Sequence, residues 1–205
     1  MISKKHKLIF IHIPKTGGSS IELSLKDVFD EKIKIVNNKN TIVSGKLKKP
    51  FKNSFNTIKH ATALELVEQY GKKDFGDFHK FTVIRNPWDR LLSLYKWGKN
   101  NNYNKIPFMK QLTKNVNNGN RTQWTINKYI CDKNNDLLVD TVLDFDNLNT
   151  DFNLLMDKFN LDLKLPHINK SKKQESFRDC MDDEVIDKIS FLYKEEIDVF
   201  WKNYL

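Results

Sequence analysis

Cysteine, glycine and long apolar runs are all scarce in this chain. Only two cysteines, Cys131 and Cys180, occur among 205 residues, too few for a disulfide framework or a metal site, so both are expected to be reduced thiols. Seven glycines and five prolines exclude a collagen-like or linker-dominated chain. No apolar run approaches the roughly 20 residues that cross a bilayer, and an early lysine interrupts the first run, which excludes a secretory signal. The first expected strand also begins close to Met1, so we expect a cytoplasmic protein.

Acidic residues are missing from one segment in particular. Between Lys32 and Lys59 the chain has eight lysines and no acidic residue, and residues 1–60 hold the whole excess behind a net charge of +9. This charge favours either an anionic partner or a solvated lysine-rich surface. Hydrophobic residues make up 39% of the chain, including 14 phenylalanines, which is enough for an ordered core. We expect residues 1–205 to form a single domain.

Short apolar segments alternate with amphipathic ones along the chain. Strands are expected over residues 7–13, 33–36, 80–84 and 141–145. Helices are expected from a cap at Ser19 or Ser20, over 62–70 and 88–99, from Pro107, over 150–159, and from a cap at Asp182 to Phe200. Strand–helix alternation of this kind predicts an α/β fold, in which helices flank both faces of a central parallel sheet.

The segment HIPKTGGSS, residues 12–20, carries the clearest functional pattern. A buried strand that runs through a glycine-containing loop into a helix presents backbone N–H groups to an anion. Gly17 and Gly18 allow close approach, and Lys15 adds a positive charge; hydroxyl donors follow from Thr16, Ser19 and Ser20. The lysine precedes the glycines, unlike in a Walker A loop, which disfavours a magnesium-dependent NTPase. A simple tight turn is the structural alternative.

A second pattern, FTVIRNPWDRLLSLY, covers residues 81–95. Arg85 follows an expected strand, and Ser93 lies about two helical turns further on, so both side chains can reach one anion near the helix start. Arg90 precedes Ser93 by three residues and is expected to face nearly the same way. In isolation, an arginine at the end of a strand is often only a surface charge.

Together, the two patterns resemble the signatures of the sulfotransferases that use 3′-phosphoadenosine 5′-phosphosulfate (PAPS). They are similar to the family-2, carbohydrate-type branch related to heparan sulfate 2-O-sulfotransferase. KHATALELVEQYG at 59–71 and LPHINKSK at 165–172 extend the resemblance, which reaches from Ile9 to Phe200 and is thin across 32–56 and 100–140. The resemblance implies a P-loop-like three-layer sandwich.

The resemblance also assigns roles to residues at matching positions. It implies that Arg85 and Ser93 hold the 3′-phosphate, and that Lys170 or Lys172 contacts a phosphate from a closing loop. The 5′-phosphosulfate would be held by Lys15, Thr16, Gly17, Gly18, Ser19 and Ser20. A fixed cation stabilises the charge that builds on the bridging oxygen during sulfuryl transfer, and Lys15 is the candidate for this catalytic role.

The acceptor hydroxyl needs a general base, and His60 lies where related carbohydrate enzymes place a catalytic histidine. His167 and a carboxylate base are alternatives, whereas His12 is expected to pack or tune the phosphate loop. Residues 144–146, Asp-Phe-Asp, replace an Arg-aromatic-Glu pattern of relatives, which puts a role of this segment in acceptor binding in doubt. Trp88 and Trp97 are expected to pack in the core.

The hypothesis is therefore sulfuryl transfer from PAPS to a hydroxyl acceptor, a carbohydrate, by in-line displacement, without a metal, a membrane span or a nucleic-acid partner. The lysines between Lys32 and Lys59 would flank the acceptor cleft and favour an anionic glycan. Three alternatives are a catalytically inactive protein of the same fold, a nucleotide or small-molecule kinase, and a basic nucleic-acid-binding module.

Overall fold

One sheet, with the strand order β1-β2-β3-β4, organises the described part of the chain. β2 (Leu8–Ile11), β3 (His79–Ile84) and β4 (Thr141–Asp144) are parallel, and β1 (Ile2–Ser3) adds an antiparallel edge. The parallel strands confirm the expected topology, whereas β1 was not expected from the sequence. They also place the carboxyl ends of β2 and β3 side by side at one edge, where ligand sites of parallel α/β sheets usually lie.

The computed structural model describes residues 1–29, 60–98, 103–117, 121–166, 175–202 and 204. The strand expected at 33–36 and the whole lysine-rich segment from Lys32 to Lys59 lie outside these residues. So do His167, Lys170 and Lys172.

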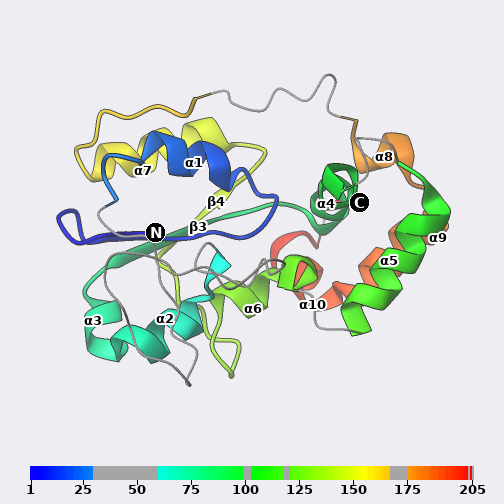
Figure 1. Ribbon diagram of the computed structural model, residues 1–205, viewed down its shortest axis with the longest axis horizontal. Coiled ribbons are helices and arrows are strands. Elements are labelled where there is room, and N and C mark those ends of the chain that lie inside the picture. The colour runs from blue at the N-terminus through cyan, green and yellow to red at the C-terminus, as the bar shows by residue number, and fades with distance from the viewer. Residues whose placement is uncertain (30–59, 99–102, 118–120, 167–174, 203, 205) are drawn as a thin grey trace, which may run out of the picture.

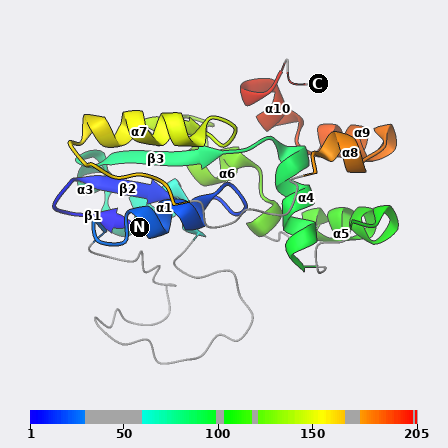
Figure 2. The same cartoon turned by 90° about the horizontal axis from the view of Figure 1, so that it is seen from above.

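Helices cover both faces of the sheet (Figures 1 and 2). Leu8 and Phe10 pack on one face against α1 (Gly18–Ser24) and α7 (Leu148–Lys158). Ile9 and Ile11, the alternate residues of β2, pack in the other cluster. That cluster includes residues of α2 (Ala63–Tyr70), α3 (Lys72–Gly76) and α6 (Ile126–Ile130). The arrangement confirms the α/β three-layer class.

A second group of helices lies beside the carboxyl edge of the sheet (Figure 1). It contains α4 (Pro87–Gly98), α5 (Lys105–Asn117), α8 (Phe177–Cys180), α9 (Asp183–Leu192) and α10 (Lys194–Phe200). Trp88 of α4 is completely buried, as expected, and stacks on Phe177. α4 directly follows β3, so it begins at the edge of the sheet and extends into this helical group. Among the described residues, no helix is long and apolar enough to cross a membrane.

The local helix signals were partly right. Thr62 and Glu65 form the predicted capping box at α2, and Asp182 caps α9. The expectation that Ser19 or Ser20 caps α1 is wrong, because the helix already begins at Gly18 and the left-handed Gly17 is its N-cap.

The single long helix expected from Asp182 to Phe200 is also wrong, because α9 ends at Leu192 and α10 begins at Lys194. The buried Tyr193 between them donates its hydroxyl to the Gln123 carbonyl, 2.6 Å away. Gln123 belongs to a short 3₁₀ helix, η2 (Arg121–Gln123). This long-range contact coincides with the break in the helical backbone.

Candidate active site

The loops that follow β2 and β3 share one end of the sheet. Ile11 and Thr82 are register partners, and the Thr82 hydroxyl donates to the Ile11 carbonyl over 2.8 Å. The chain after Ile11 therefore meets the chain after Ile84. These two segments contain Lys15 and Arg85, which the sequence analysis assigned to one ligand.

The loop between β2 and α1 has a strained backbone at its lysine. Lys15 has a φ of 68° and Gly17 a φ of 81°, both in the left-handed region. Such a φ is costly for a non-glycine residue and clusters at functional sites. Left-handed residues in loops of this kind turn backbone N–H groups toward a common concavity that suits an anion. The Thr16 hydroxyl donates to the Ile13 carbonyl at 2.9 Å, so in this structure the side chain braces the loop.

Both glycines of the loop are needed because of what lies against them. A Cβ added to Gly18 would lie 2.1 Å from Nε2 of His12, and one added to Gly17 would lie 3.0 Å from Leu148. The His12 ring is buried, stacks on Phe10, and its Nδ1 is 2.8 Å from the Glu22 carboxylate. His12 thus packs against the loop between β2 and α1, as the sequence suggested.

Lys15 and Arg85 bring two positive charges to this edge. Burial lowers the pKa of Lys15, and the charge of Arg85 lowers it further. Arg85 is 7% exposed, and no described residue accepts a hydrogen bond from its Nε. Burial also lowers the pKa of Arg85, while Asp89 and Asp146 raise it. A bound anion beside Lys15 and Arg85 would offset the cost of burying their charge.

The aromatic neighbours of the two cations come from other elements. The Arg85 guanidinium lies 4.3 Å from the centroid of the Phe145 ring, in the turn after β4. The Lys15 ammonium lies 5.5 Å from the centroid of Trp97, in the last turn of α4. Trp97 is 61% exposed, so the expectation that it packs in the core is wrong.

α4 contributes two of the predicted residues, with different outcomes. Ser93 is half-buried and lies one turn before Trp97 on the same side of the helix, which places it toward the loop. Arg90 does not join an anion site: it is 1% exposed, donates from Nη2 to the Trp124 carbonyl at 2.9 Å, and lies 3.6 Å from Glu196. Arg90 shares one helix with Ser93 at the expected spacing, but its guanidinium is engaged by Trp124 and Glu196.

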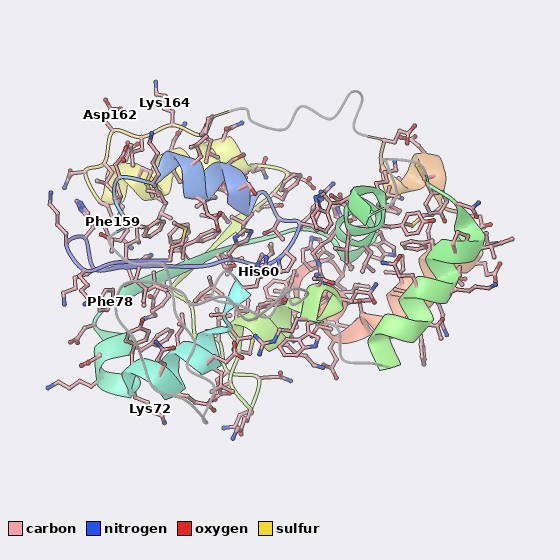
Figure 3. All side chains as sticks on the ribbon, viewed as in Figure 1. His60, Lys72, Phe78, Phe159, Asp162 and Lys164 are labelled. Carbon is pink, nitrogen blue, oxygen red and sulfur yellow. The ribbon has the colours of Figure 1, made fainter. Side chains whose placement is uncertain are left out.

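His60 stands next to the loop from the opposite face of the sheet (Figure 3). Its Nδ1 is 2.8 Å from the His12 carbonyl, and the two imidazole rings are 4.5 Å apart. A carbonyl only accepts hydrogen bonds, so Nδ1 of His60 carries the proton and Nε2 the lone pair of the neutral ring. Glu65 of the capping box at Thr62 also forms an ion pair with Arg121. These contacts hold the chain in place just after His60.

A family model described as the sulfotransferase family matches residues 1–203. The chain belongs to the sulfotransferase family. Comparisons with curated proteins and with solved structures found no match. Membership confirms the family-level resemblance and supports a transferase that moves sulfuryl groups. It also agrees with the α/β sheet and its edge loops.

This sulfotransferase brings together most of the residues predicted for its site. Lys15, Gly17, Gly18 and His60 meet around the loop after β2, and Arg85 joins them from the end of β3. Ser19 is exposed and Ser20 half-buried at the start of α1. Lys170 lies outside the described residues.

An open cavity of about 360 Å³ lies beside Phe145, and no pattern in the sequence predicted it. Its lining residues come from α4, the turn after β4 and the segment before α8: Asp89, Phe145, Asp146 and Ser176. Tyr204 spans this region, because its hydroxyl accepts from Asn86 at 3.0 Å and lies 3.2 Å from Asp146. Only the departure noted at residues 144–146 drew attention to this segment, and its aromatic residue proves to contact both Arg85 and the loop glycine Gly17.

Proposed function

We propose that this sulfotransferase moves the sulfuryl group of PAPS to a hydroxyl of a carbohydrate, as a single domain and without a metal. One observation carries the proposal: Lys15 and Arg85, from separate crossovers of the sheet, converge as two partly or largely buried cations. Charges held in this way require a compensating anion or a functional reason. A ligand with two separate anionic groups, such as a 3′,5′-bisphosphate, suits them both.

The local structure fits such a nucleotide. Within the described part of the chain the buried Nε of Arg85 has no acceptor, and a guanidinium binds phosphate in a bidentate manner. Gly17 and Gly18 have no room for a side chain against Leu148 and His12. A residue without a Cβ also lets a ligand approach the backbone closely. Arg85 with Ser93 would hold the 3′-phosphate, and Lys15 with the loop would hold the 5′-phosphosulfate. The 360 Å³ cavity next to Phe145 offers space beside Arg85.

The reaction divides between the donor and the side chains of this chain. When bound, the donor supplies the sulfuryl group: its S–O bond to the nucleotide breaks as the acceptor oxygen bonds to sulfur. Lys15 is positioned to stabilise negative charge near the loop, and the desolvation that lowers its pKa also strengthens its attraction for an anion. His60 holds its lone pair on Nε2, where it can take the proton of the acceptor hydroxyl.

Nucleotide binding tests the proposal directly. Calorimetry should detect binding of 3′-phosphoadenosine 5′-phosphate, the product of the donor, without added metal. Arg85→Gln should weaken this binding by about 10- to 100-fold, since a charge-assisted hydrogen bond contributes roughly 1.5–3 kcal/mol. AMP, which lacks the 3′-phosphate, is the matched control and should bind the variant and the wild type equally. Absence of bisphosphate binding to the wild type would overturn the proposal.

The pH dependence tests the role of His60. Protonation removes the Nε2 lone pair that a general base needs, so kcat/KM should fall on the acid side. His60→Ala should lower kcat by about 10²- to 10⁴-fold and abolish this acid limb. His79→Ala is the matched control, because His79 hydrogen-bonds Thr141 at the other end of β3. An unchanged acid limb in His60→Ala would assign the base to another group.

A further inference from the structure

Trp97 is exposed beside the loop after β2, where the sulfuryl transfer is proposed to occur. Scattered exposed aromatic residues are normal on protein surfaces, so exposure alone assigns no role. The position of Trp97 is specific, because the centroid of its ring lies 5.5 Å from the ammonium of Lys15 in the loop after β2. The indole therefore forms a 61% exposed apolar surface directly beside the expected sulfuryl group.

The side chains along α4 give this surface a direction. Arg85 precedes the helix, Ser93 lies in its middle and Trp97 in its last turn. Ser93 and Trp97 are four residues apart, which places them on one side of the helix and about 6 Å apart along its axis. The predicted 3′-phosphate contacts thus lie toward the start of α4, and Trp97 lies beyond them. Lys15 marks the sulfuryl position at the Trp97 end.

We propose that the indole of Trp97 is the platform on which a sugar ring of the acceptor packs. The inference rests on the proposed function and deepens it by assigning an acceptor subsite. A pyranose has apolar C–H faces and hydroxyl edges, so one face can pack on an aromatic ring while an edge hydroxyl points at the sulfur. Trp supplies a large, rigid contact area with little loss of conformational entropy. The exposed indole beside Lys15 meets these requirements.

The chain offers a closely matched control for this proposal. Phe191 on α9 is also an exposed aromatic residue, at 76%, and Lys188 lies over its ring at 5.9 Å. Its helix, α9, lies in the outer part of the helical group, away from the loop after β2 (Figure 1). Phe191→Ala therefore removes a similar surface feature without touching the site. Trp97→Phe keeps an aromatic face and should preserve most of the binding.

The experiment measures acceptor binding and turnover separately. Probes are unsulfated chondroitin and heparosan hexasaccharides, with 4-nitrophenol as a hydroxyl acceptor that is not a sugar. Trp97→Ala should weaken glycan binding to the complex with 3′-phosphoadenosine 5′-phosphate, measured by calorimetry, by at least about tenfold. The glycan KM should rise in parallel. The affinity for the bisphosphate itself and the melting temperature should stay unchanged.

Several outcomes would overturn the inference. Unchanged glycan affinity in Trp97→Ala would do so, as would an equal loss of glycan affinity in Phe191→Ala. A loss of bisphosphate affinity in Trp97→Ala would also contradict it. So would a wild type that binds 4-nitrophenol but neither glycan. Bisphosphate binding to the wild type without binding of either glycan overturns the platform and leaves the donor site standing. Failure of the wild type to bind the bisphosphate overturns the proposed function itself.

Discussion

Lys15→Ala should reduce kcat for sulfuryl transfer by at least about 10²- to 10³-fold, the usual effect of removing one preorganised group that stabilises transition-state charge. The side chain sits at the loop after β2, and both burial and Arg85 lower the pKa of its ammonium. Its positive charge is therefore unfavourable in the empty site and favourable once negative charge develops beside it. This difference is what accelerates a reaction. Transfer from labelled PAPS to a glycan measures the change.

The same electrostatics predict that Lys15→Ala leaves the fold as stable as the wild type. Among the described residues the ammonium makes no ion pair, and it lies over the ring of Trp97. Alanine at the left-handed φ of 68° is about as strained as lysine, so the backbone cost is the same in both proteins. Lys188→Ala, which removes a cation over the exposed Phe191, is the matched control and should keep full activity. A Lys15→Ala enzyme with more than a tenth of wild-type kcat would remove the assigned role.

The alkaline pH profile adds an independent check on Lys15. A lysine whose pKa is lowered loses its charge at a lower pH than the ordinary value of about 10.4. The charged form is the active one, so kcat should decline on the alkaline side below that pH in the wild type. The residual activity of Lys15→Ala should lack this decline.

Patterns that depend on neighbouring residues predicted their structures well. The capping box at Thr62, the cap at Asp182 and the loop Lys15-Thr16-Gly17-Gly18 involve contacts within a few residues. Their geometry follows from local backbone chemistry, so the sequence shows them directly. The meeting of Lys15 with Arg85 was also predictable, since parallel strands present their carboxyl ends at the same edge.

Features that depend on distant residues were not predictable from the sequence. Arg90 looked like a ligand contact because Ser93 follows it, but its partner is Glu196, which is completely buried in α10. The break at Tyr193 coincides with a hydrogen bond to Gln123, far away in the chain. Neither partner can be recognised without the tertiary packing.

The exposure of Trp97 is a different case, because the sequence of α4 contained a signal for it. Trp88, Leu91, Leu92 and Tyr95 define the buried side of α4, and at 100° per residue Trp97 falls on the opposite side. Its residue type suggested the core, whereas its helical phase indicated solvent. Phase alone does not decide burial, because Arg90 lies seven residues earlier on the same side and is 1% exposed; Trp97 differs in lying in the last turn of the helix.

Gly18→Ala should destabilise the protein by about 1–3 kcal/mol or more and disrupt nucleotide binding as well. A Cβ at this position would lie 2.1 Å from His12 Nε2, far inside van der Waals contact. The His12 ring cannot easily move, because it is held by Glu22, by stacking on Phe10 and by the neighbouring His60 ring. The loop or the first turn of α1 must shift instead. Urea unfolding and calorimetry with 3′-phosphoadenosine 5′-phosphate measure both effects.

Two further variants separate this clash from the general effect of replacing a glycine. Gly76→Ala, at the end of α3 where no atom lies within 4 Å of the added Cβ, should be neutral or slightly stabilising. His12→Ala should partly rescue Gly18→Ala, because it removes the atoms that the new methyl group meets. A double-mutant cycle should therefore show the double variant to be more stable than the sum of the single effects. Strictly additive losses would show that His12 is not what keeps residue 18 a glycine.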